Sequence, residues 1–171
     1  MCVAGKNEDL TFDRPEDHEP GTIERLLVAS YAGLSMDAGQ LGEYRRRWRA
    51  LDRQARESDP TGNGRVWITS LDGEPIGMAS FNLSLGLEKG VVGQNCILPG
   101  FRGRGFGRRQ VEEILRRMRE LRVQTAAVTT GDADFFAPAR RMYLACGFRQ
   151  IAAHGPGELC PFGLVEFARE L

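Results

Sequence analysis

A run of glycines and arginines at residues 100–108 holds the most informative chemistry of the sequence. It follows Ile97-Leu98-Pro99 and leads into a stretch of amphipathic pattern that begins near Arg108. Glycine allows sharp backbone turns and lets a ligand approach the main chain closely. The first N–H groups of a helix have no partner within it, and the helix dipole adds positive potential there. The run therefore predicts a site where backbone N–H groups bind a diphosphate.

The spacing of the glycines narrows the kind of phosphate site. The dinucleotide fingerprint G-x-G-x-x-G fails, because its third glycine would fall on Arg108 or Gln110. The Walker pattern fails as well, since no Gly-Lys-Ser/Thr follows. The pattern that does match is R-x-x-G-x-G, in Arg102, Gly105 and Gly107. An RNA-binding RGG segment would be repeated and disordered, and the net charge is zero, so we expect no nucleic acid partner.

Hydrophobic periodicity places this run between a strand and a helix of a mixed α/β domain. We expect strands at residues 10–13, 65–71, 75–85, 91–98, 123–130, 148–153 and 162–171. We expect helices at residues 22–34, 37–57, 108–121 and 138–146. Asp72-Gly73 predicts a tight hairpin turn, and Gly147 predicts the end of the last helix. The order β-α-α-β-β-β-α-β-α-β-β predicts a single domain at residues 9–171, after a disordered lead-in at residues 1–8 and with a break at residues 58–64.

The composition argues against several other classes of protein. The chain has 171 residues, of which 42% are apolar, and this is typical of one globular domain. It has neither a run of about 18 apolar residues nor a signal-peptide pattern, so we expect a cytoplasmic protein without membrane contact. The four cysteines form no C-x-x-C pair and the two histidines are not spaced as zinc ligands. We therefore expect reduced thiols and no metal.

The second half of the chain resembles the GNAT superfamily of N-acetyltransferases, most closely over residues 91–151. In that family a strand ending in V-x-P runs into R-x-x-G-x-G, and here Ile97-Leu98-Pro99 leads into residues 102–107. A helix, a strand and a short helix with a pattern like A-x-x-x-Y-x-x-x-G-F then follow. The corresponding residues are Ala139, Tyr143, Gly147 and Phe148. Two motifs in the family's order are far more specific than either motif alone.

The resemblance implies an acetyl-CoA-dependent N-acetyltransferase with a splayed central sheet. A primary amine of a small molecule or peptide would attack the thioester directly in a ternary complex. Acetyl-CoA would lie in a gap between the strand that ends near Pro99 and the next strand, where a main-chain N–H would polarise the thioester carbonyl. Tyr143 would be the general acid that protonates the leaving thiolate. The cofactor-binding residues would be Ile97, Leu98, Pro99, Arg102, Gly103, Arg104, Gly105, Phe106, Gly107 and Arg108.

The general base is not evident from the sequence. The family often has a glutamate in the middle of the third core strand, where this chain has Gln94, Asn95 and Cys96. Neither amide accepts a proton at neutral pH, and Cys96 fits either a buried, inert thiol or a group near the thioester. More distant residues would have to act through water: Glu43, Glu74, Glu88 or His154. The missing glutamate keeps an alternative function open, a non-catalytic module that binds or senses acyl-CoA.

Two other features of the sequence also allow two interpretations. Phe135 and Phe136 either line the cofactor path or cap the core. The apolar stripe from Leu41 to Ala55 packs either inside the monomer or against a second copy of the chain, in a homodimer. The acceptor side carries both acidic residues and an arginine-rich helix face, so the identity of the acceptor does not follow from the sequence.

Overall fold

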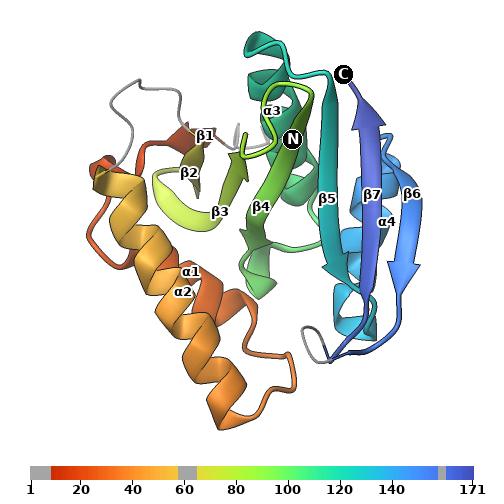
Figure 1. Cartoon of the computed structure of the whole chain (residues 1–171). Helices are drawn as coiled ribbons and strands as arrows, with labels where there is room; N and C mark the ends of the chain where they lie inside the picture. The colour runs from red at the N-terminus through yellow and green to blue at the C-terminus, as the bar shows by residue number, and fades with distance from the viewer. Residues whose placement is uncertain (1–8, 58–64, 158–160) are drawn as a thin grey trace, which may run out of the picture.

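Seven strands form one open sheet in the order β1-β2-β3-β4-β5-β7-β6 (Figure 1). The computed structural model describes residues 9–57, 65–157 and 161–171. Its strands are β1 (Leu10–Asp13), β2 (Val66–Leu71), β3 (Glu74–Asn82), β4 (Lys89–Ile97), β5 (Thr125–Gly131), β6 (Arg149–His154) and β7 (Leu164–Glu170). Among the neighbouring pairs in this sheet, β4 and β5 run parallel and the others run antiparallel. The expected mixed sheet is confirmed.

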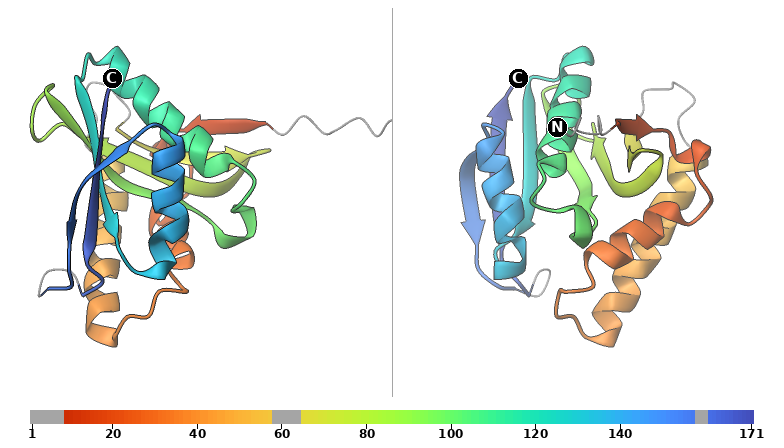
Figure 2. Two further views of the ribbon diagram at one scale, coloured as in Figure 1. Left: turned by 90° about the vertical axis from the view of Figure 1, so that its right-hand side faces the viewer. Right: turned by 180° about the vertical axis from the view of Figure 1, so that it is seen from behind.

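Helices cover both faces of the sheet (Figure 2). They are α1 (Thr22–Ser30), α2 (Ala38–Glu57), α3 (Phe106–Glu120) and α4 (Ala137–Ala145). Successive strand residues point to opposite faces, so Trp67 packs in the cluster with α3 and α4, whereas Ile68 packs in the cluster with α1 and α2. Trp48 of the α2 stripe is buried in the second cluster. Tyr44, Leu51 and Ala55 of the stripe are partly buried against this cluster, so these residues pack on the core of the monomer.

Most element boundaries agree with the sequence within a few residues. Asp72 and Gly73 both have positive φ angles, 51° and 85°, as the expected hairpin turn requires. The first helix is shorter than expected: it ends at Ser30 instead of residue 34. The ring of the next residue, Tyr31, contacts the tilted ring of Trp48 with 5.3 Å between their centroids, and a tight turn replaces further helix. The expected lead-in at residues 1–8 and break at residues 58–64 lie outside the described residues.

Strands β4 and β5 lie side by side at their first residues and part toward their carboxyl ends (Figure 1). Their pairing covers three positions, from Lys89 opposite Thr125 to Val91 opposite Ala127. Beyond Val91, the edge of β4 that faces β5 has no strand partner within the described sheet. The sequence-based expectation of a splayed central sheet is confirmed, and the parted edge of β4 is where the candidate site is built.

A bulge in β4 sets which face its later residues occupy. Phe81 of β3 pairs with Val92, and Ala79 pairs with Asn95, so three steps on β4 match two steps on β3. Without the extra residue, Val92 and Asn95 would point to opposite faces. With it, both side chains face α3 and α4, and Cys96 turns toward α1 and α2.

Candidate active site

The loop after β4 leads directly into the amino terminus of α3. Gly103 and Gly105 have φ angles of 76° and 85°, which side chains with a Cβ rarely adopt. No heavy atom lies within 4 Å of the position a Cβ would take at either residue. Glycine is therefore required here by backbone conformation, and the space around both residues is open.

Gly105 is the N-cap of α3, so the helix begins at Phe106, two residues earlier than expected. The Arg109 N–H donates to the Gly105 carbonyl at 3.1 Å, which is the first bond of the helical ladder. The N–H groups of Phe106, Gly107 and Arg108 precede that bond and point out of the helix end. This arrangement suits an anion, because the N–H groups and the helix dipole act in the same direction.

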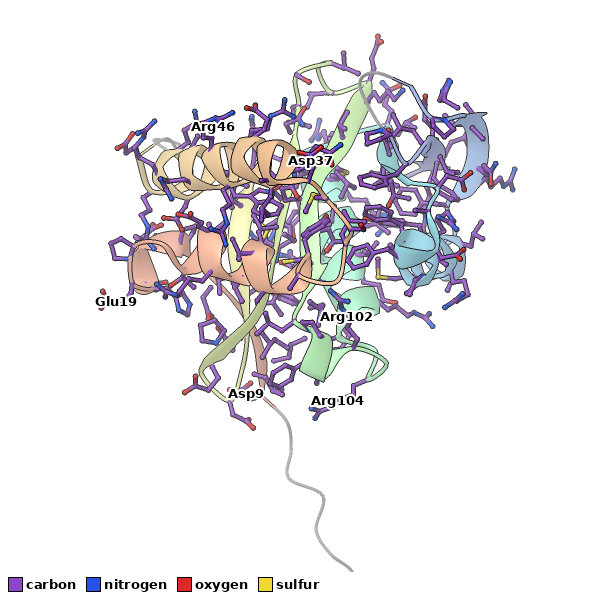
Figure 3. All side chains as sticks on the ribbon, turned by 90° about the horizontal axis from the view of Figure 1, so that it is seen from below. Asp9, Glu19, Asp37, Arg46, Arg102 and Arg104 are labelled. Atoms are coloured by element: carbon purple, nitrogen blue, oxygen red, sulfur yellow. The ribbon has the colours of Figure 1, made fainter. Side chains whose placement is uncertain are left out.

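The Arg102 side chain, although exposed, donates hydrogen bonds to main-chain carbonyls of the protein itself. Its Nε donates to the Ile97 carbonyl at 2.9 Å, and its Nη2 donates to the Ser30 carbonyl at the end of α1 at 2.7 Å. Its own N–H donates to the Pro99 carbonyl at 3.3 Å. Figure 3 shows Arg102 close to the helices and Arg104 at the outer rim of the molecule. The motif arginine thus ties the loop to α1.

Gly107 serves the packing of two helices. A Cβ at this position would lie 2.9 Å from the Sδ atom of Met142 on α4, so the absence of a side chain lets α3 and α4 approach closely. The three residues of R-x-x-G-x-G therefore have three different roles. Arg102 ties the loop, Gly105 shapes the start of the helix, and Gly107 brings α4 and its Tyr143 near the sheet.

The end of β4 directs one backbone N–H into the gap. The Leu98 N–H donates to the Ile76 carbonyl of β3 at 2.8 Å. Because main-chain groups alternate between the two edges of a strand, the Ile97 N–H faces the parted edge. The Ile97 side chain is buried beside Phe106, and Pro99 is exposed at the start of the loop.

Tyr143 lies on α4, 4% exposed, with its hydroxyl directed at β4. The Asn95 Nδ2 donates to that hydroxyl at 3.1 Å. Burial raises the pKa of Tyr143 to about 12, while the hydrogen bond from Asn95 acts in the opposite direction. Gly147 turns the chain so that Phe148 packs against the Tyr143 ring at 5.6 Å, which explains the G-F spacing of the motif. At neutral pH the phenol holds its proton.

A sequence model of the acetyltransferase (GNAT) family matches residues 23–148 of this chain. The chain belongs to the GNAT acetyltransferase family. No protein with a curated description matches it in sequence. Solved structures of other family proteins share the fold of this GNAT domain at low sequence identity.

Three of these structures cover nearly the whole chain. A GNAT-family protein from Desulfovibrio desulfuricans superposes with a TM-score of 0.74 at 15% identity, covering 95% of this chain and 98% of its own. An acetyltransferase from Thermus thermophilus gives a TM-score of 0.65 at 22% identity, covering 96% and 97%. A Bacillus subtilis acetyltransferase in complex with CoA gives 0.64 at 14% identity, covering 96% and 99%.

Three residues of uncertain role near the GNAT site, Cys96, Phe135 and Phe136, differ in their burial: Cys96 is buried and the two phenylalanines are partly buried. Cys96 is buried in the α1–α2 cluster, and burial raises the pKa of its thiol, so it is neutral and inaccessible. Phe135 and Phe136 contact each other at 5.0 Å, and Phe136 contacts Phe162 at 6.2 Å. Both rings also contact Tyr31. These contacts favour the interpretation that the two partly buried rings cap the core beyond β5.

Sequence reasoning missed Gln110, a fully buried amide in the apolar face of α3. Its Nε2 donates to Asn95 Oδ1 and to the Met78 carbonyl, the latter at 2.9 Å. The available signal was a polar residue directly before Val111 in the stripe that faces the sheet.

Within the described residues, no three His, Cys, Asp or Glu side chains gather as a metal site would require. No helix among them is long and apolar enough to cross a membrane.

Proposed function

We propose that this GNAT protein is an acetyl-CoA-dependent N-acetyltransferase that acetylates a primary amine of a small molecule or peptide. The observation that carries the proposal is the parted edge of β4, which has the amino terminus of α3 at one end and the Tyr143 hydroxyl beside its middle. Family membership supports acetyl transfer, and one relative with the same fold is a complex with CoA.

The residues of the loop fit the diphosphate of coenzyme A. The N–H groups from Gly103 to Arg108 would bind it, and the open space above Gly103 and Gly105 leaves room for its oxygens. The pantetheine would take the place of a strand along the parted edge of β4. There the Ile97 N–H would donate to the thioester carbonyl and stabilise the negative charge that develops on its oxygen.

The reaction needs a proton at the sulfur. The amine nitrogen forms a bond to the acetyl carbon, and the carbon–sulfur bond breaks with its electron pair on sulfur. Tyr143, neutral because of its raised pKa, donates its proton to that sulfur. The strand offers no base: β4 carries no carboxylate, and Cys96 is a buried neutral thiol. We propose that the acceptor amine arrives unprotonated and, once bonded to the acetyl carbon, gives one of its two N–H protons to water, while the amide product keeps the other.

The second candidate is a module that binds acyl-CoA without transferring the acyl group. The observation that favours it is the absence of a carboxylate from β4, where the family often carries a glutamate.

For either function we propose a cytoplasmic location, as expected from the sequence. The described cysteines, Cys96 and Cys146, are free thiols, which is consistent with a reducing compartment.

Two measurements separate these functions. Calorimetric titration with acetyl-CoA tests the cofactor site, and absence of binding at millimolar ligand contradicts both candidates. Release of free thiol is then followed with acetyl-CoA and a panel of aminoglycosides, polyamines, amino acids and peptides. Turnover with any of these amines supports the transferase. Binding without turnover across the whole panel, at pH 7 to 9 where amines deprotonate progressively, supports the sensing module.

A further inference from the structure

Four elements contribute to a chain of polar side chains that ends at the candidate acid. Thr69 of β2 donates its hydroxyl to Gln110 Oε1 on α3. Gln110 Nε2 donates to Asn95 Oδ1 on β4, and Asn95 Nδ2 donates to the Tyr143 hydroxyl at 3.1 Å. Thr69 and Gln110 are fully buried in an otherwise apolar core, where polar groups are costly unless their hydrogen bonds are satisfied.

The main chain of β3 determines the direction of every bond in this relay. A backbone carbonyl can only accept, so the Gln110 atom that lies 2.9 Å from the Met78 carbonyl must be the NH2 group. The same group lies 3.3 Å from the Cys96 carbonyl, which imposes the same orientation. Of the two Gln110 protons, one goes to the Met78 carbonyl and the other faces Asn95, with the Cys96 carbonyl as a longer second acceptor, so Oδ1 is the Asn95 atom that accepts.

The orientation of Asn95 then decides the state of the phenol. Since Oδ1 accepts from Gln110, the NH2 group of Asn95 faces Tyr143, and the hydroxyl oxygen must accept that bond. Its own proton is then directed away from Asn95, available to another acceptor. An Asn95 in the opposite orientation would accept that proton and hold it.

We propose that Gln110 and Asn95 are positioning residues that hold the Tyr143 hydroxyl as an acceptor and so reserve its proton for the leaving sulfur. This inference rests on the proposed acetyl transfer. When the carbon–sulfur bond breaks, the proton passes from the Tyr143 oxygen to sulfur. The phenolate that remains keeps the Asn95 N–H bond, which stabilises its charge, and it regains a proton from water.

The most direct variant is Asn95→Asp, which keeps the shape of the side chain and removes its donor. A carboxylate can still accept from Gln110, but it accepts from Tyr143 as well and holds the phenolic proton. We expect kcat to fall on the order of 100-fold at neutral pH, with the Kd of acetyl-CoA within about twofold of the wild type. Asn82→Asp, which adds the same charge at an exposed position of β3, is the matched control and keeps kcat.

The pH profile separates positioning from a merely structural role. Below the pKa of the introduced carboxyl group, its protonated form can donate to Tyr143 again. The kcat of Asn95→Asp relative to that of Asn82→Asp should therefore recover as the pH is lowered. A fold defect would lower kcat by a similar factor at every pH. Unchanged kcat in Asn95→Asp, or a loss without recovery at low pH, overturns the proposal.

A second measurement needs neither activity nor a charged residue in the core. The side-chain NH2 protons of Asn95 are assigned by NMR in the wild type and in Tyr143→Phe. The proposal predicts that one proton shifts upfield when its acceptor is removed, while the NH2 protons of exposed Gln150 do not move. Unmoved Asn95 protons overturn the relay even if the enzyme is active. A shifted proton in a protein that acetylates no amine supports the relay and contradicts the proposed function instead.

Discussion

The two ends of the parted edge of β4 are built in different ways. At the carboxyl end, consecutive residues of one loop offer main-chain N–H groups, and the glycines at 103 and 105 give the backbone its shape. Beside the middle of the strand, the site depends on side chains that four different elements bring together: Thr69, Asn95, Gln110 and Tyr143. A site made of local backbone can be recognised from a motif, whereas a site assembled from distant side chains depends on the register of the sheet.

The largest effect on kcat is expected beside the middle of β4, where side chains from four elements meet. Tyr143→Phe removes the proton donor and keeps the ring that packs on Phe148 and Phe167. We expect kcat to fall about 100-fold while the Kd of acetyl-CoA changes little, because general acid catalysis contributes about 100- to 10,000-fold. Steady-state kinetics and calorimetry measure the two quantities. Tyr44→Phe, which removes a hydroxyl from α2, is the control. A kcat equal to that of the wild type would remove Tyr143 from the mechanism.

The next largest effect, on the affinity for acetyl-CoA, is expected in the loop between β4 and α3. Gly105→Ala forces a Cβ into a conformation with φ of 85°, which costs about 1–2 kcal/mol and favours a different start to α3. We expect the Kd of acetyl-CoA to rise about tenfold, measured by calorimetry. Gly100→Ala is the matched control, since a Cβ there meets nothing within 4 Å and Gly100 is not among the glycines with positive φ. Equal affinity in the two variants would show that the start of α3 does not hold the cofactor.

A smaller effect, on stability, is expected at Gly107, where α3 packs against α4. Gly107→Ala places a Cβ 2.9 Å from the flexible end of Met142 and pushes α3 away from α4. We expect the free energy of unfolding to fall by about 1 kcal/mol in urea titrations. In a Met142→Ala background the same change should cost less, because the clash is gone. An equal cost in both backgrounds would contradict the packing role of this glycine.

A still smaller loss is expected from Arg102→Gln. Its side-chain bonds to the Ile97 and Ser30 carbonyls stabilise the loop against α1. Because the residue is partly exposed, we expect the free energy of unfolding to fall by less than about 1 kcal/mol. The salt dependence of acetyl-CoA binding should stay as in the wild type, as followed by calorimetry at several ionic strengths. A weaker salt dependence would mean that the guanidinium binds phosphate after all.

The smallest effect is an expected absence of change with pH. An unperturbed tyrosine loses its proton near pH 10, but burial raises the pKa of Tyr143 to about 12. The acid form is present below the pKa, so the kcat profile should show no alkaline decline from Tyr143 between pH 7 and 10. Rate measurements with a saturating amine check this range. A decline centred near pH 9 that disappears in Tyr143→Phe would contradict the raised pKa.

The sequence was informative wherever the determinants are local. R-x-x-G-x-G, the Asp72-Gly73 turn and the Tyr143 motif each rely on a few neighbouring residues, and their positions were correctly expected. The orientation of Asn95 was not predictable, because a bulge in β4 changes the face that residues after Val92 occupy. A strict period of two places Asn95 on the opposite face. The side-chain contact of Arg102 with the Ser30 carbonyl was not predictable either, since the two residues are distant in sequence.

The central claim is that backbone amides at the start of α3 bind the diphosphate of acetyl-CoA. Titrating the ¹⁵N-labelled protein with acetyl-CoA tests it directly through the glycine amides. We expect the N–H resonances of Gly103, Gly105 and Gly107 to move in a saturable way, while those of Gly73 and Gly86, glycines with positive φ elsewhere, stay in place. Saturable binding that leaves the three loop resonances unmoved would contradict the account.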